Sequence, residues 1–419
     1  MHKLHLPLLP CLILLFASLS KAIAEDYPAS TSKKPVKVFI LAGQSNMQGK
    51  GFPEPMVWQI GQDQYRERYT HLIQGGDYEA FLAKVAETRD PEQPRESPTY
   101  LWSERRDVWI NYLEKRGNLK VGYGTPRDGF GPELNFGHVV GNHFDEQVLI
   151  IKTSWGGRAI AKGFMPPSAM HSDEQFAEMT KALNEKNRKW NEEEPARIKK
   201  YNERIAKEKA EGGKTKGGKP KRPRTFKARE MVTVEQFKAN YGSDYRNMIQ
   251  EVRGCLSQLK ERFPGYANQG YELSGFVWFQ GWNDQYNEYW LSYEDNMAHF
   301  IRDVRKELNT PKLPFVIGQM GHGGKVEPIK EDSPRAFIKR AQAKVPTYPE
   351  FQGNVICVET DQYWDMEAHA IYTGPGGWSK DVNKWRQFGN DRAYHYYGSP
   401  WFFAQAGTGF GEAMLKLLK

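Results

Sequence analysis

The sequence predicts an α/β protein in which helices cover both faces of a parallel β-sheet, giving a three-layer α/β/α sandwich. Five short apolar runs, rich in β-branched and aromatic residues, are almost continuously hydrophobic, which is typical of strands buried on both faces. Segments with a helical pattern lie between these runs. This alternation is typical of parallel strands joined by right-handed crossovers.

The expected elements follow in chain order. The predicted strands are Lys37–Ala42, Gln147–Thr153, Gly275–Gln280, Pro314–Met320 and Asn354–Thr360. The predicted helices are Pro132–His143, Asp244–Phe263, Trp290–Leu308 and Ala404–Leu418. Ligands of such sheets bind beyond the carboxyl ends of the strands, so the residues after each run are the first candidates for a site.

The N-terminus has the pattern of a secretory signal peptide. Lys3 precedes an apolar run from Leu4 to Leu19, and Ala22-Ile23-Ala24 is a small-x-small cleavage site. The run is short for a bilayer span. We therefore expect residues 1–24 to be removed after Ala24 and the remaining chain to be secreted or periplasmic, without a membrane span. Residues 34–419 are expected to form a single domain.

Two long insertions interrupt this domain. The first covers about residues 52–122, is rich in aromatic residues, and is expected to be ordered over the sheet edge or the site. The second covers about residues 173–241 and begins as a charged, solvated helix. It continues into a tract that lacks apolar anchors, which predicts a flexible loop.

Charge and cysteine usage exclude several classes. The net charge is +8, but seven basic residues without one acid lie between Lys214 and Lys227, so the excess is local. This argues against a nucleic-acid face across the fold. Only Cys255 and Cys357 follow the signal peptide, with no spacing typical of a zinc site. The role of the basic loop 214–227 and the oligomeric state stay open.

Small and polar residues follow the predicted strands. The first strand ends in Gly43-Gln44-Ser45-Asn46 and the second in Ser154-Trp155-Gly156-Gly157-Arg158. The third ends in Gln280-Gly281-Trp282-Asn283-Asp284. Near the C-terminus comes Asn390-Asp391-Arg392-Ala393-Tyr394-His395. Parallel strands end at one edge of the sheet, so these side chains are expected to lie close together.

These residue types suit acyl transfer by a serine. A serine hydroxyl is a weak nucleophile that needs an imidazole to take its proton, and a carboxylate holds that imidazole in one tautomer. The tetrahedral intermediate carries a negative oxygen that needs preorganised N–H donors, each contributing about 3–4 kcal/mol to lowering the barrier. Backbone N–H groups of Ser45 and of the Gly156-Gly157 turn, with the Asn283 amide, are the candidate donors.

Three motifs together resemble a known superfamily. Gly43-Gln44-Ser45-Asn46-Met47, Ser154-Trp155-Gly156-Gly157 and Gly281-Trp282-Asn283-Asp284 resemble blocks of the SGNH hydrolases. The first two resemble in particular the branch of sialate O-acetylesterases and the acetylxylan esterases of carbohydrate esterase family six. The resemblance covers about residues 36–165 and 270–419. It implies a flavodoxin-like, five-stranded parallel sheet, removal of acetyl groups from sugar hydroxyls, and no metal or organic cofactor.

The resemblance also implies roles. Ser45 would be the nucleophile, His395 the general base and Asp391 the acid that orients it. Two departures from the branch pattern matter. Trp282 stands where the branch usually has the glutamate of Gln-Gly-Glu, and one extra residue separates Asp391 from His395. The carboxylate could instead come from Asp361 or Asp365, or be replaced by a backbone carbonyl.

Structural alternatives accompany each assignment. Ser45 could cap the next helix, the glycines could only form a turn, and Asn283 with Asp284 could form a cap pair. His322 and His369 are rivals to His395.

Four residues are candidates for substrate binding: Gln44, Arg158, Gln280 and Trp282. Arg158 could contact a substrate carboxylate or hydroxyl, or pair with a buried acid such as Asp284. Trp282 and Trp385 are the candidates for stacking against sugar rings.

The leading hypothesis is thus an exported, metal-independent serine esterase that deacetylates a carbohydrate such as an acetylated polysaccharide or a sialic acid. The alternative is a carbohydrate-binding protein on the same fold with impaired catalysis, because of Trp282 and the Asp391–His395 spacing. Another ester activity, such as lipase action, is disfavoured because no apolar lid helix is evident.

Overall fold

The protein is built on one seven-stranded sheet. The computed structural model describes residues 27–88, 101–125, 128–210 and 222–419, and the predicted signal peptide lies outside them. The strand order is β3-β2-β4-β1-β5-β6-β7. Every neighbouring pair is parallel except β2 with β3. The strands are β1 (Val36–Gly43), β2 (Arg105–Tyr112), β3 (Lys115–Leu119), β4 (Val148–Ser154), β5 (Tyr271–Phe279), β6 (Phe315–Gln319) and β7 (Val355–Glu359).

The expected sheet is present but larger than five strands. The five predicted runs occur as β4, β1, β5, β6 and β7. The prediction of five strands is wrong because the insertion over residues 52–122 adds β2 and β3 beside β4. β3 has the sequence KRGNL and β2 begins with two arginines and an aspartate. Charged edge strands resist pairing with other chains, and for the same reason they escape a search for apolar runs.

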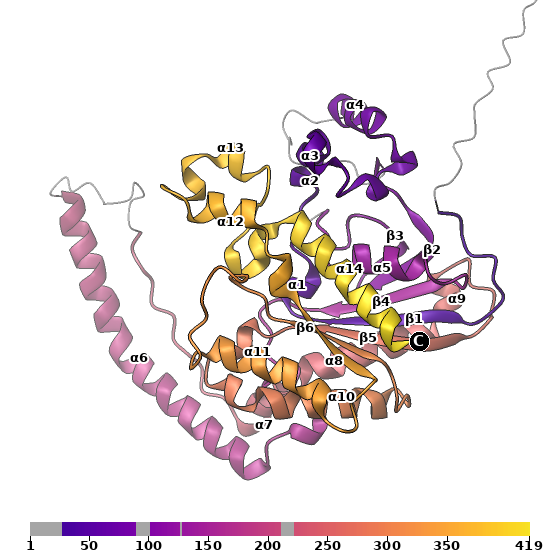
Figure 1. The fold of residues 1–419 in the computed structure, drawn as a ribbon. Coiled ribbons are helices and arrows are strands. Elements are labelled where there is room, and N and C mark those ends of the chain that lie inside the picture. The colour runs from indigo at the N-terminus through magenta and orange to yellow at the C-terminus, as the bar shows by residue number, and fades with distance from the viewer. Residues whose placement is uncertain (1–26, 89–100, 126–127, 211–221) are drawn as a thin grey trace, which may run out of the picture.

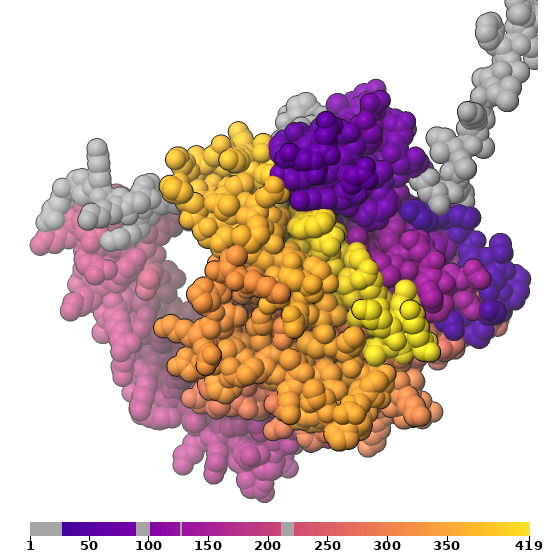
Figure 2. All heavy atoms as spheres, viewed as in Figure 1, coloured from indigo at the N-terminus to yellow at the C-terminus, as the bar shows by residue number. Residues whose placement is uncertain are grey.

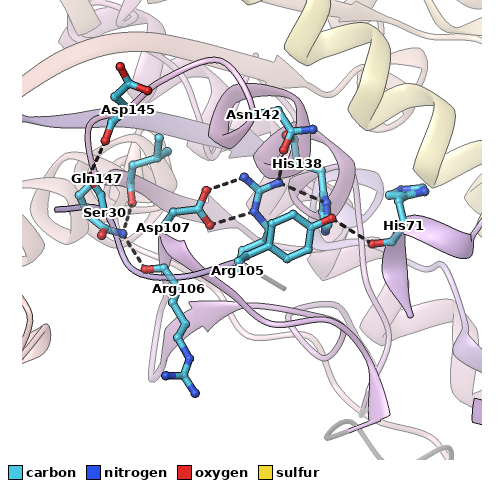
Figure 3. A network of polar contacts seen from close by, with 11 residues as sticks. Ser30, His71, Arg105, Arg106, Asp107, His138, Asn142, Asp145 and Gln147 are labelled. Atoms are coloured by element: carbon cyan, nitrogen blue, oxygen red, sulfur yellow. Dashed lines mark hydrogen bonds and ion pairs between the residues drawn. The ribbon is translucent and has the colours of Figure 1, made fainter. Parts of the chain in front are cut away.

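A buried arginine attaches this edge to the body. Arg105, at the start of β2, is 1% exposed. Its guanidinium donates to the carboxylate of Asp107, to Asn142 Oδ1 at 2.7 Å and to the carbonyl oxygen of His138 at 3.2 Å (Figure 3). It also lies 4.1 Å from the ring centre of Tyr27. One side chain therefore joins β2 to the helix that precedes β4 and to the N-terminal segment.

Helices cover both faces of the sheet (Figure 1). Side chains of β1 alternate: Phe39 and Leu41 join one apolar cluster with helices α5 and α14, whereas Val38 and Ile40 join a second with α8 and α10. Both clusters are almost fully buried, so each face of β1 is core and its sequence is continuously apolar. The three-layer α/β/α arrangement follows.

The helices match the expected ones with shifted ends. The range Asp244–Phe263 is divided at Gln258 into α8 and α9, and the last helix starts earlier, at Pro400, because Ser399 caps it by accepting from Phe402 N. The helices are α1 (Ser45–Gln48), α2 (Pro53–Ile60), α3 (Asp63–Arg66), α4 (Tyr78–Thr88), α5 (Glu133–Gly141), α6 (Asp173–Ala210), α7 (Val234–Ala239), α8 (Ser243–Ser257), α9 (Leu259–Arg262), α10 (Tyr293–Glu307), α11 (Pro334–Lys344), α12 (Met366–Thr373), α13 (Val382–Trp385) and α14 (Pro400–Leu417).

The charged insertion forms a long arm. Its predicted helix is α6, with 38 residues, and residues 222–232 then run back along it as an extended segment. Of the tract predicted to be a flexible loop, residues 211–221 lie outside the described residues.

In the described part of the chain, no helix combines the length and apolar character that crossing a membrane requires. Cys255 and Cys357 are free thiols.

Close packing of α14 on α5 depends on one glycine. A methyl group added at Gly407 would lie 2.3 Å from the carbonyl oxygen of Pro132, which is too close for any real contact. We predict that Gly407→Ala lowers the free energy of unfolding by about 1–3 kcal/mol, despite the better helix propensity of alanine. Urea denaturation measures this. Lys416→Ala on the exposed side of α14 is the control, expected to change stability by less than about 0.5 kcal/mol. An unchanged Gly407→Ala variant would contradict the close approach.

Candidate active site

The serine of the first motif stands at the carboxyl edge of the sheet. β1 ends at Gly43, whose φ of +153° and whose position against Phe279 exclude a side chain, since an added methyl group would lie 2.2 Å from the Phe279 carbonyl oxygen. Ser45 begins the single-turn helix α1 and is 6% exposed. Gln44 is the N-cap residue of α1, so the alternative that Ser45 caps this helix is wrong.

Gln44 ties the first motif to the third. Its side-chain oxygen accepts from the backbone N–H of Gly281 at 3.3 Å and of Asn283 at 3.4 Å. Gln44 is 2% exposed, and Gln280 is 3% exposed and donates to the carbonyl oxygen of Arg158 at 2.9 Å. Both glutamines therefore hold loops together below the surface.

The second motif approaches the same point. Gly156 and Gly157 are exposed, and Gly157 has φ +72°. A methyl group built on Gly156 would lie 3.8 Å from Ser45 Cβ, and one built on Gly157 would lie 4.0 Å from Asn283 Nδ2. The three motifs thus converge around Ser45.

Asp284 braces this convergence from beneath. Its carboxylate accepts from Ile160 N at 2.9 Å, from Ala161 N at 3.0 Å and from the Gln280 amide. Complete burial raises the pKa of Asp284 to about 6, although these three donors favour the charged form. Asp284 therefore ties the loop after β5 to the chain after β4.

Arg158 has a different acidic partner from the one considered in the sequence. Its Nε lies 3.4 Å from Asp244 Oδ2, while its side chain is half exposed. Burial raises the pKa of Asp244, and the charge of Arg158 opposes that rise. Arg158 therefore pairs with Asp244 rather than with Asp284.

The late motif brings a histidine and a carboxylate together. His395 Nδ1 lies 2.9 Å from Asp391 Oδ2. The backbone between and after them forms a tight loop in which Tyr396 and Tyr397 have φ values of 50° and 63°. The N–H groups of Asn390 and Asp391 both donate to the Tyr397 carbonyl oxygen. This loop accommodates the extra residue between Asp391 and His395.

The other candidate acids are engaged elsewhere. Asp361 Oδ2 accepts from Lys339 Nζ at 2.9 Å. Asp365 caps α12 and accepts from the Ser399 hydroxyl. Asp391 is thus the carboxylate that contacts His395.

Most of the chain matches one protein family. Residues 35–198 and 229–371 match the family described as carbohydrate esterase, sialic acid-specific acetylesterase. The chain belongs to this family. The resemblance inferred from the three motifs is therefore confirmed.

The solved structures that are similar to this chain have low sequence identity with it. They include a protein from Arabidopsis thaliana, 14% identical, which covers 91% of this chain and 98% of its own, with a TM-score of 0.43. A carbohydrate acetylesterase from Xanthomonas citri is 12% identical over 77% of this chain and 49% of its own, with a TM-score of 0.38. NanS is 12% identical over 78% of each chain, with a TM-score of 0.36. No curated protein matches the sequence.

His322, a rival in the sequence, supports the loop that carries His395. Its Nε2 lies 2.8 Å from the Tyr394 carbonyl oxygen, to which Asn46 Nδ2 also donates at 3.3 Å. His322 stacks on Tyr396 with ring centres 4.3 Å apart. Burial lowers the pKa of His322 to about 3, so the ring is neutral at physiological pH and its Nε2–H donates. The other rival, His369, contacts the Tyr397 hydroxyl at 2.9 Å.

The two tryptophans proposed for stacking differ. Trp282 is half-buried and lies with its ring centre 4.4 Å from that of His322 and 6.0 Å from that of Tyr394. Trp385 is 4% exposed and packs in the core against Tyr372 and Tyr397, so its proposed stacking on a sugar is wrong. Trp282 therefore lines the His395 loop, where the branch pattern has a glutamate.

A buried ion pair behind the serine had no signal in the sequence motifs. Lys152 of β4 and Glu133 of α5 are both fully buried, with Nζ and Oε2 2.7 Å apart. Lys152 Nζ also donates to the carbonyl oxygens of Gln48 and Tyr123, each at 2.8 Å. The ammonium thereby fixes the last residue of α1, one turn after Ser45.

Within the described residues, no three His, Cys, Asp or Glu side chains gather to hold a metal ion.

Removing one member of this pair should be more harmful than removing both. We predict that Lys152→Met lowers the free energy of unfolding by about 3–5 kcal/mol, because the Glu133 carboxylate is left buried without its partner. Adding Glu133→Leu should recover part of that loss but not all, since two carbonyl oxygens stay without their donor. Chemical denaturation of both variants measures the difference. A double variant as unstable as Lys152→Met would contradict the explanation.

The Asp391–His395 contact predicts a pH-dependent contribution to stability. Burial pushes the pKa of Asp391 upward, but the hydrogen bond and charge of His395, the Arg392 N–H and Lys50 together hold that pKa below its ordinary value of 3.8. A depressed carboxylate pKa stabilises the folded state above the unfolded pKa, and this stabilisation disappears as the pH falls through the folded pKa.

Asp391→Asn should therefore cost most stability above pH 3.8, and its difference from the wild type should shrink below that pH. Denaturation curves across that range measure the difference. In a His395→Ala background, the same substitution should show a weaker pH dependence. An equal effect in both backgrounds would contradict the role of His395.

Proposed function

We propose that this chain is an exported serine esterase that removes O-acetyl groups from a carbohydrate through an acyl-enzyme on Ser45. Membership in a carbohydrate esterase family supports the reaction class and the type of substrate. The observation that carries the proposal is the convergence of Ser45, the glycine turn and Asn283 at one sheet edge, together with the 2.9 Å contact between His395 and Asp391.

In the proposed mechanism, Ser45 attacks the acetyl carbonyl carbon and its proton passes to His395 Nε2. Asp391 holds the opposite ring nitrogen and stabilises the imidazolium that forms. The N–H groups of Ser45 and of the Gly156-Gly157 turn, with the Asn283 amide, stabilise the negative oxygen of the tetrahedral intermediate. This intermediate collapses by breaking the bond to the sugar oxygen, which takes the proton from His395.

The second half repeats the sequence with water. His395 takes a proton from the water molecule, whose oxygen attacks the acetyl group on Ser45, and acetate leaves as the Ser45 hydroxyl recovers its proton. The surrounding contacts support a preorganised site. Asn46 and His322 hold the backbone next to His395, and Lys152 holds the end of α1, so little reorganisation accompanies the reaction.

The Asp391–His395 contact favours this proposal over a binding protein with impaired catalysis. The irregular spacing that motivated that alternative is accommodated by the loop around Tyr396 and Tyr397. Trp282 replaces a side chain of the branch pattern, while Asn283 lies next to the Gly157 turn. The proposed export rests on the N-terminal sequence alone.

Replacing the nucleophile tests the proposal directly. We predict that Ser45→Ala lowers kcat for acetate release from p-nitrophenyl acetate and from acetylated xylan by about 10³-fold or more. Circular dichroism and thermal denaturation check that the fold is retained. Ser257→Ala, on the exposed side of α8, is the matched control and should leave the rate unchanged. Undiminished turnover by Ser45→Ala would overturn the assignment.

A further inference from the structure

The arm formed by α6 and residues 222–232 is a distinct feature of the molecule. An α-helix of 38 residues is about 57 Å long. Figure 1 shows α6 along the side of the body toward which the carboxyl ends of the central strands point, and Figure 2 shows an opening between its outer part and the body. The family match skips residues 199–228, whose described part belongs to the outer end of this arm.

Asparagine side chains fix the returning segment on the helix. Asn184 pairs with the backbone of Val232, Asn191 with that of Arg229, and Asn202 with that of Arg224. In each pair the amide donates to the carbonyl oxygen and accepts from the N–H of the same residue, at distances of 2.7–2.9 Å. An extended chain held in this way keeps its register along the helix.

Aromatic rings position two of the arginines on this segment. The guanidinium of Arg229 lies 3.8 Å from the ring centre of Trp190, and that of Arg224 lies 4.3 Å from the ring centre of Tyr201. Both arginines are exposed. Their charges are therefore held in place at the surface by stacking.

Charge is segregated along the arm. Residues 173–194 carry seven acids and four bases. The described residues from 197 to 229 carry ten bases and two acids. These bases are Arg197, Lys199, Lys200, Arg204, Lys207, Lys209, Arg222, Arg224, Lys227 and Arg229. The basic charge is thus concentrated at the outer end of the arm.

The basic end also contains a hollow. A cavity of about 690 Å³ lies between α6 and the returning segment. Five basic residues line it against two acids, Glu194 and Glu203, together with Ile198 and Tyr201. The basic residues are Arg197, Lys200, Arg204, Lys207 and Arg224. Lys200, Arg204 and Lys207 follow one face of the helix over about 10 Å. Guanidinium groups bind carboxylates and sulfates through paired N–H donors.

We propose that the described residues of this basic end of the arm, 197–210 and 222–229, form a docking surface for a linear anionic polysaccharide. The exposed cations, of which Arg224 and Arg229 are held in place by stacking, match a polymer with regularly spaced carboxylate or sulfate groups. The arm stands on the side of the sheet that holds Ser45. A polymer bound to the arm is thereby held on the same side of the molecule as the proposed active site. The docking itself goes beyond ester hydrolysis and needs no catalysis.

The test compares charge at the arm with charge on the body. The arm variant Lys199→Gln, Lys200→Gln, Arg222→Gln, Lys227→Gln removes four exposed cations. The control variant Lys260→Gln, Lys306→Gln, Lys312→Gln, Lys416→Gln removes four exposed cations from α9, α10, the turn after it and α14. Affinity electrophoresis of each full chain uses polygalacturonate, dextran sulfate and uncharged dextran at low ionic strength.

The wild type should bind both charged polymers but not dextran, and the stronger of the two identifies carboxylate or sulfate as the preferred anion. The arm variant should bind about 10- to 100-fold more weakly, while the body variant keeps its affinity. Equal losses in both variants, or no loss in the arm variant, would overturn the proposal. Tighter binding to duplex DNA or to anionic vesicles than to either charged polymer would overturn it as well.

A second variant separates ordered geometry from total charge. Asn191→Ala with Asn202→Ala leaves every charge in place but releases the returning segment from α6. We expect several-fold weaker binding to the charged polymers. Unchanged binding would contradict a role for the ordered position of the returning segment. Ser45→Ala should bind the polymers normally, and the arm variant should hydrolyse p-nitrophenyl acetate normally. Failure of docking and failure of the proposed esterase activity are thus distinguishable.

Discussion

The arrangement of the site depends on the contacts of one fully buried charge, the Lys152 ammonium group. It contacts three acceptors from three segments: the carboxylate of Glu133 in α5, the carbonyl oxygen of Gln48 in α1 and that of Tyr123. Lys152 itself belongs to β4, two residues before Ser154. The same strand therefore positions the helix that begins with Ser45 and continues into the glycine turn. Burying a charge is costly, and only this complete set of partners offsets the loss of hydration.

Two carboxylates of the site region have different pKa values because their surroundings differ. Asp284 receives backbone and amide N–H donors with no cation, and burial raises its pKa to about 6. Asp391 is partly exposed, and contact with His395 helps to hold its pKa below the ordinary value. The first acid is suited to bracing two loops, and the second to orienting an imidazole. His322, neutral because of burial, adds a directional hydrogen bond without adding charge beside His395.

Basic side chains have different surroundings in the core and on the arm. In the core, Arg105 and Lys152 each donate to several acceptors, so their charges are paired within the protein and are not available to a ligand. On the arm, asparagines perform the joining, and the basic side chains stay exposed. A polar amide can bind a backbone in both directions, which makes it suited to hold an extended segment on a helix without using charge.

The sequence by itself determined the central strands, the layer arrangement and the positions of the motifs at strand ends. Continuous apolar runs record burial on both faces, and glycines beside Ser45 and after β4 record turns that side chains would block. Only the tertiary structure decided that β2 and β3 extend the sheet, that Lys152 pairs with Glu133, that Asp391 contacts His395 across an irregular loop, and that His322 supports that loop. The tertiary structure also decided that Trp385 belongs to the core. These features depend on contacts between residues far apart in the chain or on loop geometry, and local patterns of hydrophobicity and turn residues do not record such pairings.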